Sequence, residues 1–340
     1  CTMDMPRQPR RSGHAPLPLP DQVALVLQGG GALGSYQAGV IERLAALGIG
    51  IDWVAGISIG AINAAIIAGN PPEQWVSRLS EFWTLVSSGL PNFCVPEDDQ
   101  LREGAHLAAA GAVLLGGVPG FFRPHLLAPI WAPPGTREAI SYYNTAPLRE
   151  TLDRLIDWDR VNHGPMRLSI GAVDIESGNF VYFDNQDPQW RGRIDARHVM
   201  ASGALPPGLP QVEIDGRHYW DGGLVSNTPL AHVLDHQSGD LLIFQVDLFP
   251  AEGPLPQEMS DVWSRQKDIQ YSSRTRQVTD RFLRARREHE AIRALLDRLP
   301  DEWVAAVLSH GTRLIAENIV SGRSATFDLA MTGQIKEKQA

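Results

Sequence analysis

Residues 51–69 read IDWVAGISIGAINAAIIAG, and this stretch decides the fold. The apolar run 51–57 predicts a buried β-strand, and the small and apolar residues that follow predict a helix. The two elements meet at Gly56-Ile57-Ser58-Ile59-Gly60, which satisfies the G-x-S-x-G pattern of a nucleophile elbow. Gly56 and Gly60 allow the backbone to turn tightly, so that the hydroxyl of Ser58 projects above the sheet. The stretch therefore predicts an α/β fold with Ser58 as the candidate nucleophile.

A glycine-rich loop precedes this strand in the chain. Residues 22–27 (QVALVL) predict a strand buried on both faces, which breaks into Gly29-Gly30-Gly31-Ala32-Leu33-Gly34. A helical pattern follows from Tyr36 to Leu47 and is expected to end at Gly48. A glycine-rich loop that opens a helix exposes backbone N–H groups to an anion. That anion is either a phosphate or the oxyanion of a tetrahedral intermediate.

The same loop allows a different function. Gly29, Gly31 and Gly34 satisfy G-x-G-x-x-G, the fingerprint of dinucleotide-binding domains. Such domains carry an acidic residue about 20 positions further on, at the end of the second strand, where it binds the ribose. Here Asp52 stands at the start of that strand and Ser58 at its end. A nucleotide- or phosphate-binding domain without hydrolytic activity is therefore the alternative to a serine hydrolase.

An Asp-Gly-Gly motif lies far downstream. Residues 212–218 predict a hairpin that turns at Asp215-Gly216, and Tyr219-Trp220-Asp221-Gly222-Gly223 follows it. Two glycines after an aspartate allow a close approach of the backbone. Taken alone, the motif is also typical of an ordinary turn.

The three motifs, in this order, resemble the layout of the patatin-like phospholipases. The similarity runs from Val23 to Val246, and residues 54–72 and 142–155 are similar to bacterial members with an additional C-terminal region. The resemblance implies a three-layer α/β fold with a mostly parallel central sheet flanked by helices. It also implies a lipid acyl hydrolase that uses a Ser–Asp dyad and an acyl-enzyme intermediate, with no cofactor and no metal.

The resemblance also implies a role for each motif. Ser58 would be the nucleophile and Asp221 the base that takes its proton, with Gly222 and Gly223 supporting the aspartate. Backbone N–H groups of the first loop would form the oxyanion hole, namely those of Gly29, Gly30, Gly31 and Ala32. The chain departs from the family at two positions, since many patatins have a basic residue in place of Leu33 and an acidic or small residue in place of Gln28. These departures keep the backbone donors but alter the charge near the loop.

A carboxylate is a weak base towards a serine hydroxyl, so the dyad needs a dry pocket. Burial raises the pKa of an aspartate toward the working pH and strengthens its hydrogen bond to the serine. Tyr219, Trp220 and Leu224 flank Asp221 in the sequence and are expected to exclude water from it.

Histidines offer alternatives to the dyad. His218 and His232 are the histidines nearest to Asp221 in the sequence, and a histidine would complete a triad, although we expect His218 at the surface of the hairpin. His232 and His236 stand four residues apart on an expected helix, which is a spacing of metal ligands. No H-E-x-x-H pattern accompanies them, so we expect two helical histidines without a metal.

The composition narrows the class of protein. The chain has 340 residues, of which 43% are hydrophobic and 20% charged, as in an ordinary globular protein. Its net charge of −9 argues against a nucleic-acid partner. The two cysteines, Cys1 and Cys94, cannot form a disulfide framework, which favours a reducing compartment and a cytoplasmic location. Residues 1–20 lack the apolar core of a signal peptide and are expected to form a disordered tail.

Residues 21–250 form the expected catalytic domain. Its further strands are expected at 166–173, 180–183 and 241–248, the last as a buried parallel strand, and further helices at 142–156 and 198–205. The domain contains an insertion, 88–137, whose apolar part spans 105–131. Glycine and proline make this part unsuited to a membrane span. It is either a lid that contacts a lipid interface or a helix pair buried on the core.

Residues 251–340 form an expected helical C-terminal extension, with short helices at 301–308 and 313–319. Within it, residues 264–287 hold the acids Asp268 and Asp280 and a larger number of basic residues, namely Arg265, Lys267, Arg274, Arg276, Arg281, Arg284, Arg286 and Arg287. One interpretation is a patch for the anionic headgroups of a membrane surface. The other is a solvated helix face paired with acids of the catalytic domain.

Overall fold

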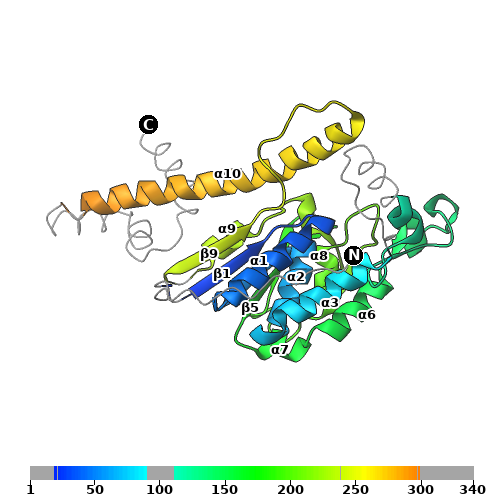
Figure 1. The fold of residues 1–340 in the computed structure, drawn as a ribbon, viewed down its shortest axis with the longest axis horizontal. Coiled ribbons are helices and arrows are strands. Elements are labelled where there is room, and N and C mark those ends of the chain that lie inside the picture. The colour runs from blue at the N-terminus through cyan, green and yellow to red at the C-terminus, as the bar shows by residue number, and fades with distance from the viewer. Residues whose placement is uncertain (1–18, 21, 90–110, 238, 297, 299–340) are drawn as a thin grey trace, which may run out of the picture.

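The computed structural model describes residues 19–298 with the exception of 21, 90–110, 238 and 297. Within these residues a central β-sheet lies between two layers of helices, as Figure 1 shows. Most of the expected tail lies outside the described residues, and so do Cys1, Cys94 and the helices expected at 301–308 and 313–319.

The sheet has seven strands, namely β1 (Gln22–Leu27), β2 (Trp53–Ile57), β5 (Arg167–Asp174), β6 (Phe180–Asp184), β7 (Val212–Ile214), β8 (Arg217–Asp221) and β9 (Leu241–Val246). A two-stranded sheet pairs β3 (Arg123–Pro124) with β4 (Tyr143–Asn144). The α-helices are α1 (Ser35–Ala46), α2 (Ile59–Ala68), α3 (Trp75–Ser87), α5 (Arg137–Ile140), α6 (Ala146–Leu155), α7 (Trp158–His163), α8 (Ala196–Ser202), α9 (Leu230–Asp235) and α10 (Met259–Leu296). Short 3-10 helices are η1 (Gly31–Gly34), η2 (Pro72–Gln74), η3 (Pro129–Trp131) and η4 (Gly222–Leu224).

Four neighbouring strands of the sheet run parallel. The order is β7-β8-β5-β2-β1-β9, with β6 paired to β5 outside this path. β9, β1, β2 and β5 are parallel, whereas β6 and β8 run antiparallel to β5 and β7 runs antiparallel to β8. Because β1 and β2 are parallel neighbours, the glycine-rich loop after β1 and Ser58 after β2 lie at the same edge of the sheet.

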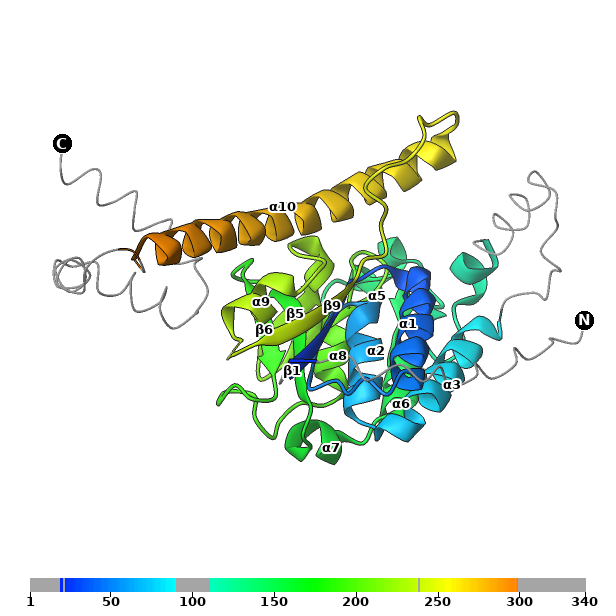
Figure 2. The same cartoon turned by 60° about the vertical axis from the view of Figure 1, so that its left-hand side comes forward.

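Two hydrophobic clusters cover the two faces of the sheet. On one face α1, α2, α3 and α6 build the larger cluster, in which Ile62, Ile66 and Phe82 are fully buried. All ten residues of α2 are buried, because its small side chains let the helix lie close against the strands. On the other face Trp53 belongs to the cluster of Val233 of α9, against which Phe282 of α10 packs. Figure 2 shows α10 passing over α9 on this face.

The architecture confirms the predicted α/β fold with helices on both faces of a central sheet. Two local expectations are wrong. The helix expected at 142–156 begins only at Ala146, because Tyr143 and Asn144 pair with β3. The run 241–248 is not a fully buried strand, because β9 lies at the end of the strand order and most of its residues are half-buried.

In the described part of the insertion, one region packs on the core and another is exposed to solvent. Phe121 packs on the core beside Phe82, with ring centroids 6.5 Å apart. In contrast, the exposed fractions of Leu126, Ile130 and Trp131 are 105%, 82% and 77%. Burial on the core is therefore wrong for residues 126–131. No helix in the described ranges is both long enough and apolar enough to cross a membrane.

The basic segment 264–287 belongs to α10. Arg265 pairs with Asp268 at 3.9 Å and Arg286 with Glu290 at 3.0 Å, so these ion pairs lie along the helix itself. Arg274 reaches the segment after β8, where it donates to the backbone carbonyls of Leu224 and Val225 rather than to an acid. At these three positions the expected pairing with acids of the catalytic domain is wrong.

Candidate active site

Ser58 stands at the turn between β2 and α2. Its dihedral angles, φ 54° and ψ −123°, are a conformation that residues other than glycine rarely adopt. The glycines of the motif make room for the turn, because a Cβ on Gly56 would collide with the carbonyl of Gly60 and a Cβ on Gly60 with the carbonyl of Leu27. The two strands and the helix therefore approach more closely than a side chain would permit.

The pairing of β5 explains why Ser58 and Asp221 meet. β2 pairs with residues 167–171 of β5 and β8 with residues 172–174. Because β6 pairs with residues 169–173, it occupies one edge of β5 and leaves β2 and β8 to share the other. β2 runs parallel to β5 and β8 antiparallel, so the two strands end opposite adjacent residues of β5 and face each other end to end. Folding thereby brings Ser58, directly after β2, to Asp221, the last residue of β8.

A hydrogen bond joins the two side chains. Ser58 Oγ donates to Asp221 Oδ2 at 2.7 Å, and the N–H of Gly223 donates to Asp221 Oδ1 at 2.7 Å. Ser58 is half-buried and Asp221 is 3% exposed. Burial raises the pKa of Asp221 to about 6, while the hydrogen bonds from Ser58 and Gly223 act in the opposite direction. The carboxylate is thus ionised at neutral pH yet more basic than an ordinary aspartate, which suits it to accept a proton from Ser58.

The surroundings of Asp221 differ in part from the expectation. Tyr219 is 3% exposed, as expected, but Leu224 is 38% exposed and leaves that side open. Gly222 packs tightly instead, since a Cβ on it would lie 2.6 Å from the carbonyl oxygen of Gly171. Close packing of the strand ends therefore contributes to the burial of the carboxylate.

Ser202, at the end of α8, holds the backbone of the elbow. Its Oγ accepts a hydrogen bond from the N–H of Ser58 at 2.9 Å and donates to the carbonyl of Gly171 at 2.6 Å. Ser202 therefore ties the elbow to β5 at the point where the strands meet. No sequence motif marks this residue, so its role appears only in the tertiary contacts.

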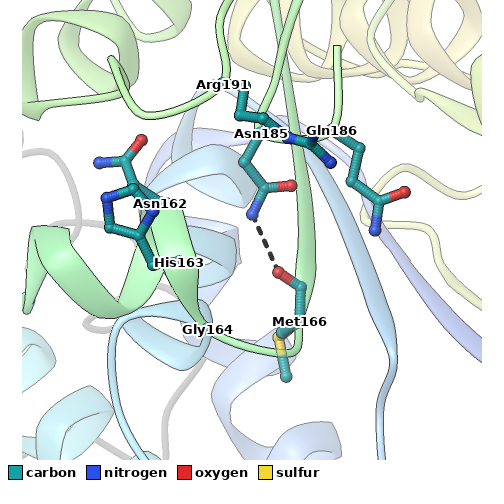
Figure 3. Close-up of a pocket in the computed structure, with 7 residues that line it drawn as sticks. All are labelled: Asn162, His163, Gly164, Met166, Asn185, Gln186 and Arg191. Atoms are coloured by element: carbon teal, nitrogen blue, oxygen red, sulfur yellow. Dashed lines mark hydrogen bonds between the residues drawn. The ribbon is translucent and has the colours of Figure 1, made fainter. Parts of the chain in front are cut away.

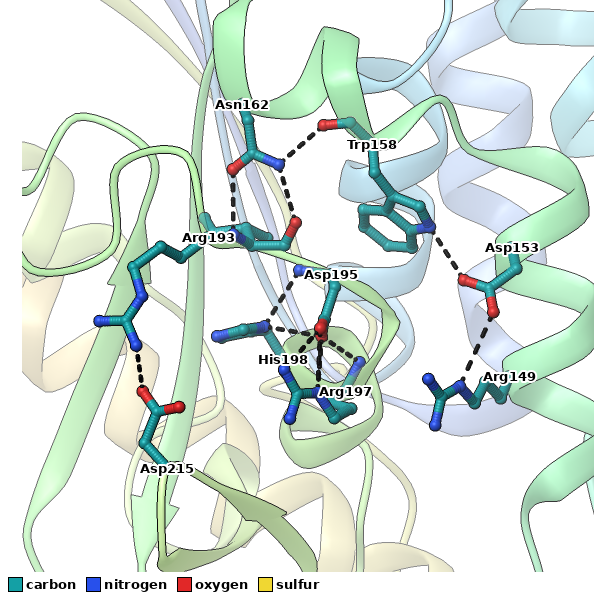
Figure 4. A network of polar contacts seen from close by, with 10 residues as sticks. Arg149, Asp153, Trp158, Asn162, Arg193, Asp195, Arg197, His198 and Asp215 are labelled. Atoms are coloured by element: carbon teal, nitrogen blue, oxygen red, sulfur yellow. Dashed lines mark hydrogen bonds and ion pairs between the residues drawn. The ribbon is translucent and has the colours of Figure 1, made fainter.

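Figure 4 shows how the amino end of α8 is fixed. The carboxylate of Asp195 accepts from the N–H of Arg197 at 2.9 Å, and the N–H of Asp195 donates to His198 Nδ1 at 3.1 Å, which makes a capping box. Asn162 anchors the preceding residue, Ile194, through two hydrogen bonds of 2.9 Å. These contacts hold α8, and with it Ser202, in place.

The glycine-rich loop lies against both Ser58 and the segment after Asp221. A Cβ on Gly29 would lie 3.1 Å from the Cβ of Ser58. The N–H of Gly29 donates to the carbonyl of Asn227 at 3.1 Å, and Asn227 Nδ2 donates to the carbonyl of Gly29 at 2.7 Å. Because the N–H of Gly29 is engaged, the expectation that it serves as an oxyanion donor is wrong in this arrangement. Asn227 is a second site residue that the sequence analysis misses.

Gly30, Gly31 and Ala32 remain the predicted oxyanion donors. Gly31 has a φ of 57°, which favours glycine, and it opens η1. The first N–H groups of a helix have no partner within the helix. Gly31 and Ala32 are exposed, and a Cβ on Gly31 would meet no atom within 4 Å, so this part of the loop is accessible from solvent.

The histidines near Asp221 in the sequence have other partners in the structure. His218 Nδ1 lies 3.9 Å from Glu176 Oε1. His232 Nε2 lies 3.1 Å from Asp184 Oδ2, and burial lowers the pKa of His232. Among the residues that the structure describes, no group of three or more histidine, cysteine or acidic side chains could hold a metal ion.

Asp52 does not take the position of a ribose ligand. Its Oδ2 accepts from the N–H of Val23 at 2.8 Å, at the amino ends of β1 and β2. The glycine-rich loop lies at their carboxyl ends, so the geometry argues against the dinucleotide interpretation.

A polar pocket of about 280 Å³ lies at the amino end of β5 (Figure 3). Asn185 Nδ2 donates there to the carbonyl of Met166 at 2.9 Å. Ser58 follows the carboxyl end of β2, which runs parallel to β5, so this pocket belongs to the opposite edge of the sheet. It is a feature separate from the Ser58 site.

Two protein-family models match parts of this chain. The family model described as patatin-like phospholipase matches residues 25–234, which contain all three motifs. A second model, described as patatin phospholipase, matches residues 269–312, a range that begins within α10.

Curated relatives carry related names. Lysophospholipase NTE1 of Kluyveromyces lactis is 24% identical over 248 residues, which are 70% of this chain and 13% of that protein. Patatin-like phospholipase domain-containing protein 7 of Rattus norvegicus is 50% identical over 61 residues, which are 18% of this chain and 4% of that protein. The chain thus spans only a small part of the length of these relatives.

Among solved structures, the chain matches VipD from Legionella pneumophila with a TM-score of 0.38 and 18% identity over 66% of this chain and 50% of VipD. A chain of the SpcU–ExoU complex from Pseudomonas aeruginosa has a TM-score of 0.34 and 16% identity over 89% of this chain and 61% of that one. The family model, in contrast, covers more than half of the sequence, from β1 to α9. The chain belongs to the patatin-like phospholipase family.

Proposed function

We propose that this protein is a serine acyl hydrolase that cleaves acyl ester bonds of lipids, in the manner of a phospholipase A. The observation that carries the proposal is the 2.7 Å hydrogen bond from Ser58 to Asp221 at a strained strand-to-helix turn. Membership of the patatin-like phospholipase family supports a hydrolase that acts on lipid esters. We assign the activity to residues 21–250, the proposed catalytic domain.

In the proposed reaction Ser58 and Asp221 act as a dyad. Ser58 Oγ attacks the carbonyl carbon of the ester while its proton passes to Asp221 Oδ2, and the carbonyl oxygen becomes an oxyanion. The bond to the alcohol then breaks, and the alcohol leaves with the proton from Asp221. Water attacks the acyl-serine in the second half of the reaction and gives a proton to Asp221. The fatty acid departs, and the proton returns to Ser58 Oγ.

Backbone amides of the glycine-rich loop are proposed to stabilise the oxyanion. The N–H groups of Gly30, Gly31 and Ala32 stand at the start of η1, where unpaired amides favour a negative charge. The close approach of Gly29 to the Cβ of Ser58 supports this assignment, because the loop then lies next to the side chain of the candidate nucleophile.

Exposed apolar side chains around the site support contact with a lipid surface. We define the apolar rim as five residues of the three segments that meet at Ser58, namely Leu33, Tyr36, Leu205, Leu224 and Val225, which are between 38% and 66% exposed. The insertion is connected to the segment after Leu205, because its strand β3 pairs with β4 and the N–H groups of Tyr142 and Tyr143 donate to the carbonyl of Gly208. The insertion itself exposes two further apolar side chains, Leu126 and Trp131. Exposed apolar patches of this kind mark interaction sites, and here we propose a lipid interface as the partner.

Lipid hydrolysis tests the proposed reaction. Wild-type protein and Ser58→Ala are incubated with a panel of phospholipids, lysophospholipids and short acyl esters, and released fatty acid is measured. Release by the wild type that Ser58→Ala abolishes is the expected result. An inactive wild type that binds nucleotides tightly would favour the phosphate-binding alternative.

Vesicle assays test the proposed lipid contact. Leu126→Ser combined with Trp131→Ser is expected to lower hydrolysis of vesicle lipids by about tenfold or more, since each buried apolar side chain contributes about 1.5–3 kcal/mol. Hydrolysis of a soluble ester should stay unchanged. Leu47→Ser combined with Val76→Ser removes two other exposed apolar side chains and serves as the control. Equal vesicle activity in both double variants would contradict the proposed surface.

A further inference from the structure

Helix α10 follows β9, the last strand in the chain, and contacts segments of the candidate active site. Two neighbouring side chains of this helix contact the segments that carry the glycine-rich loop and Asp221. We propose that these residues, Thr275 and Arg274, are positioning residues that hold the glycine-rich loop and the Asp221 turn in place against each other. This proposal rests on the hydrolase function proposed above and concerns the same site.

Gln28 connects the glycine-rich loop to α10. It directly precedes Gly29 and is fully buried. Its Nε2 donates to Thr275 Oγ1 at 3.1 Å, and its Oε1 accepts from the N–H of Leu248 at 2.6 Å. Its backbone carbonyl accepts from Gln37 Nε2 at 2.7 Å. The side-chain amide of Gln28 is thus the group that contacts α10.

Thr275 joins this loop to the segment after Asp221. It is 5% exposed, and its Oγ1 lies 2.7 Å from Oγ1 of Thr228, which is equally buried. Because the hydroxyl of Thr275 donates within α10, its lone pairs accept from Gln28 and from the hydroxyl of Thr228. Thr228 directly follows Asn227, which holds Gly29 through two hydrogen bonds. The buried hydroxyl of Thr275 is therefore a hydrogen-bond partner of both segments, of the glycine-rich loop through Gln28 and of the segment after Asp221 through Thr228.

Arg274 holds the turn that orients Asp221. Its Nη1 donates to the carbonyl of Leu224 at 3.2 Å and to that of Val225 at 3.0 Å. These carbonyls lie at the end of η4, the turn whose Gly223 N–H binds Asp221 Oδ1. Arg274 therefore anchors to α10 the segment that sets the position of the carboxylate.

Apolar contacts also connect α10 with the glycine-rich loop. Tyr271 packs on Phe249 with ring centroids 4.8 Å apart. Leu248, the neighbour of Phe249, lies against Gly30, where a Cβ would come within 2.7 Å of Leu248 Cδ1. Burial and then the charge of Asp221 raise the pKa of Tyr271, so α10 lies within electrostatic reach of that carboxylate.

Positioning of this kind acts on turnover more than on binding. A catalytic group and its oxyanion donors need placement to within about 0.5 Å, which a loop provides only when its backbone is bonded to rigid elements. Without the hydroxyl of Thr275, Gln28 Nε2 and Thr228 each lose a buried partner. The loop then samples unproductive positions, while the contacts that bind the substrate remain.

Thr275→Val tests the proposal, because valine keeps the shape of threonine and removes only the hydroxyl. With a soluble acyl ester at about pH 8, kcat is expected to fall about tenfold, with KM within about twofold of the wild type. Thr275→Ser keeps the hydroxyl and is expected to restore kcat. Arg274→Met is the second variant and is expected to lower kcat in the same way.

Three matched controls lie on the same helix. Thr279→Val removes a hydroxyl that bonds back to the carbonyl of Thr275 within α10. Ser272→Ala removes a buried hydroxyl for which the described part of the chain offers no hydrogen-bond partner. Arg276→Met removes an exposed arginine two positions from Arg274. All three are expected to keep kcat within about twofold of the wild type.

Amide hydrogen exchange tests the positioning role independently of the hydrolase activity. Exchange in residues 28–34 and 222–228 should be about tenfold faster in Thr275→Val than in Thr279→Val, with no change in residues 167–174. An inactive wild type would contradict the hydrolase function, and exchange would still decide whether Thr275 holds the two segments. Wild-type kcat and wild-type exchange in both Thr275→Val and Arg274→Met would overturn the proposal.

Discussion

Ser58 Oγ donates a hydrogen bond of 2.7 Å to Asp221 Oδ2, although the two residues stand 163 positions apart in the chain. The contact follows from strand pairing, because β2 and β8 share one edge of β5 and end opposite adjacent residues. The pairing of the strands therefore brings the candidate nucleophile and base together. Hydrogen bonds of Ser202 with the elbow and of Gly223 with the carboxylate then orient them.

The raised pKa of Asp221 predicts how the activity depends on pH. The carboxylate must be ionised to accept the proton of Ser58, and burial raises its pKa to about 6. We expect kcat/KM for a soluble ester to rise about tenfold per pH unit below that value and to level off above it. A pH–rate profile from about pH 4.5 to about 8.5 checks this, and a flat profile between pH 5 and pH 7 would contradict it.

The same pKa predicts how stability depends on pH. Since the pKa rises from 3.8 to about 6 on folding, the folded protein holds this proton more tightly than the unfolded chain. The contribution to stability is present at low pH and is lost as the pH rises through about 6, at a cost of about 3 kcal/mol. Asp221→Asn should therefore be more stable than the wild type at about pH 8, by about 1–3 kcal/mol, while its turnover falls by orders of magnitude.

Urea unfolding at about pH 5 and about pH 8 measures this difference, which should shrink at the lower pH. Asp159→Asn removes a carboxylate whose side chain is 89% exposed and serves as the control. Asp221→Asn with wild-type turnover would mean that another base takes the proton.

Substitution by alanine is expected to have opposite effects on stability at Gly60 of the elbow and at Gly39 of helix α1. Gly60→Ala would drive its Cβ into the carbonyl of Leu27, so we expect a loss of about 2 kcal/mol or more in the free energy of unfolding. Gly39 lies on the exposed side of α1 with open space around it. Gly39→Ala should therefore stabilise the protein by about 0.5–1 kcal/mol. Equal effects of the two changes on urea unfolding would rule out the close strand–helix approach.

Ser202 is expected to affect both stability and turnover. Ser202→Ala leaves the N–H of Ser58 and the carbonyl of Gly171 without their shared partner. We expect a loss of about 1–3 kcal/mol in stability and a lower kcat, because the elbow can then shift. Ser77→Ala removes an exposed hydroxyl that bonds back to Gln74 and should change neither quantity. Unchanged kcat in Ser202→Ala would show that the elbow holds its own geometry.

The local parts of this site could be predicted from the sequence. β1, the elbow and the hairpin before Asp221 each have a local signal, either an apolar run or a fixed turn pattern. The elbow serine and the Asp-Gly-Gly aspartate could be paired only through the family resemblance, since no local pattern reveals the register of β5. The partners of the site, Ser202 and Asn227, carry ordinary side chains whose roles come from tertiary contacts.

Long-range contacts also explain where the structure differs from the sequence-based expectations. The family resemblance implies that Gly29 offers its N–H to an oxyanion, but that group bonds to Asn227, which lies 198 positions away. Leu224 is apolar and adjacent to the motif, yet it points out at the surface because η4 turns there. Composition indicates a basic C-terminal segment, but it cannot indicate that Arg274 contacts Leu224 and that Thr275 contacts Gln28.

Covalent labelling by a fluorophosphonate tests the central claim most directly, because the probe reacts with a serine whose proton a neighbouring base can take. The protein is labelled, digested and mapped by mass spectrometry. We predict a single adduct on Ser58 in the wild type, none in Ser58→Ala, and labelling at least about 100-fold slower in Asp221→Asn. An unlabelled wild type, an adduct on another residue, or an Asp221→Asn variant that labels at the wild-type rate would contradict the account.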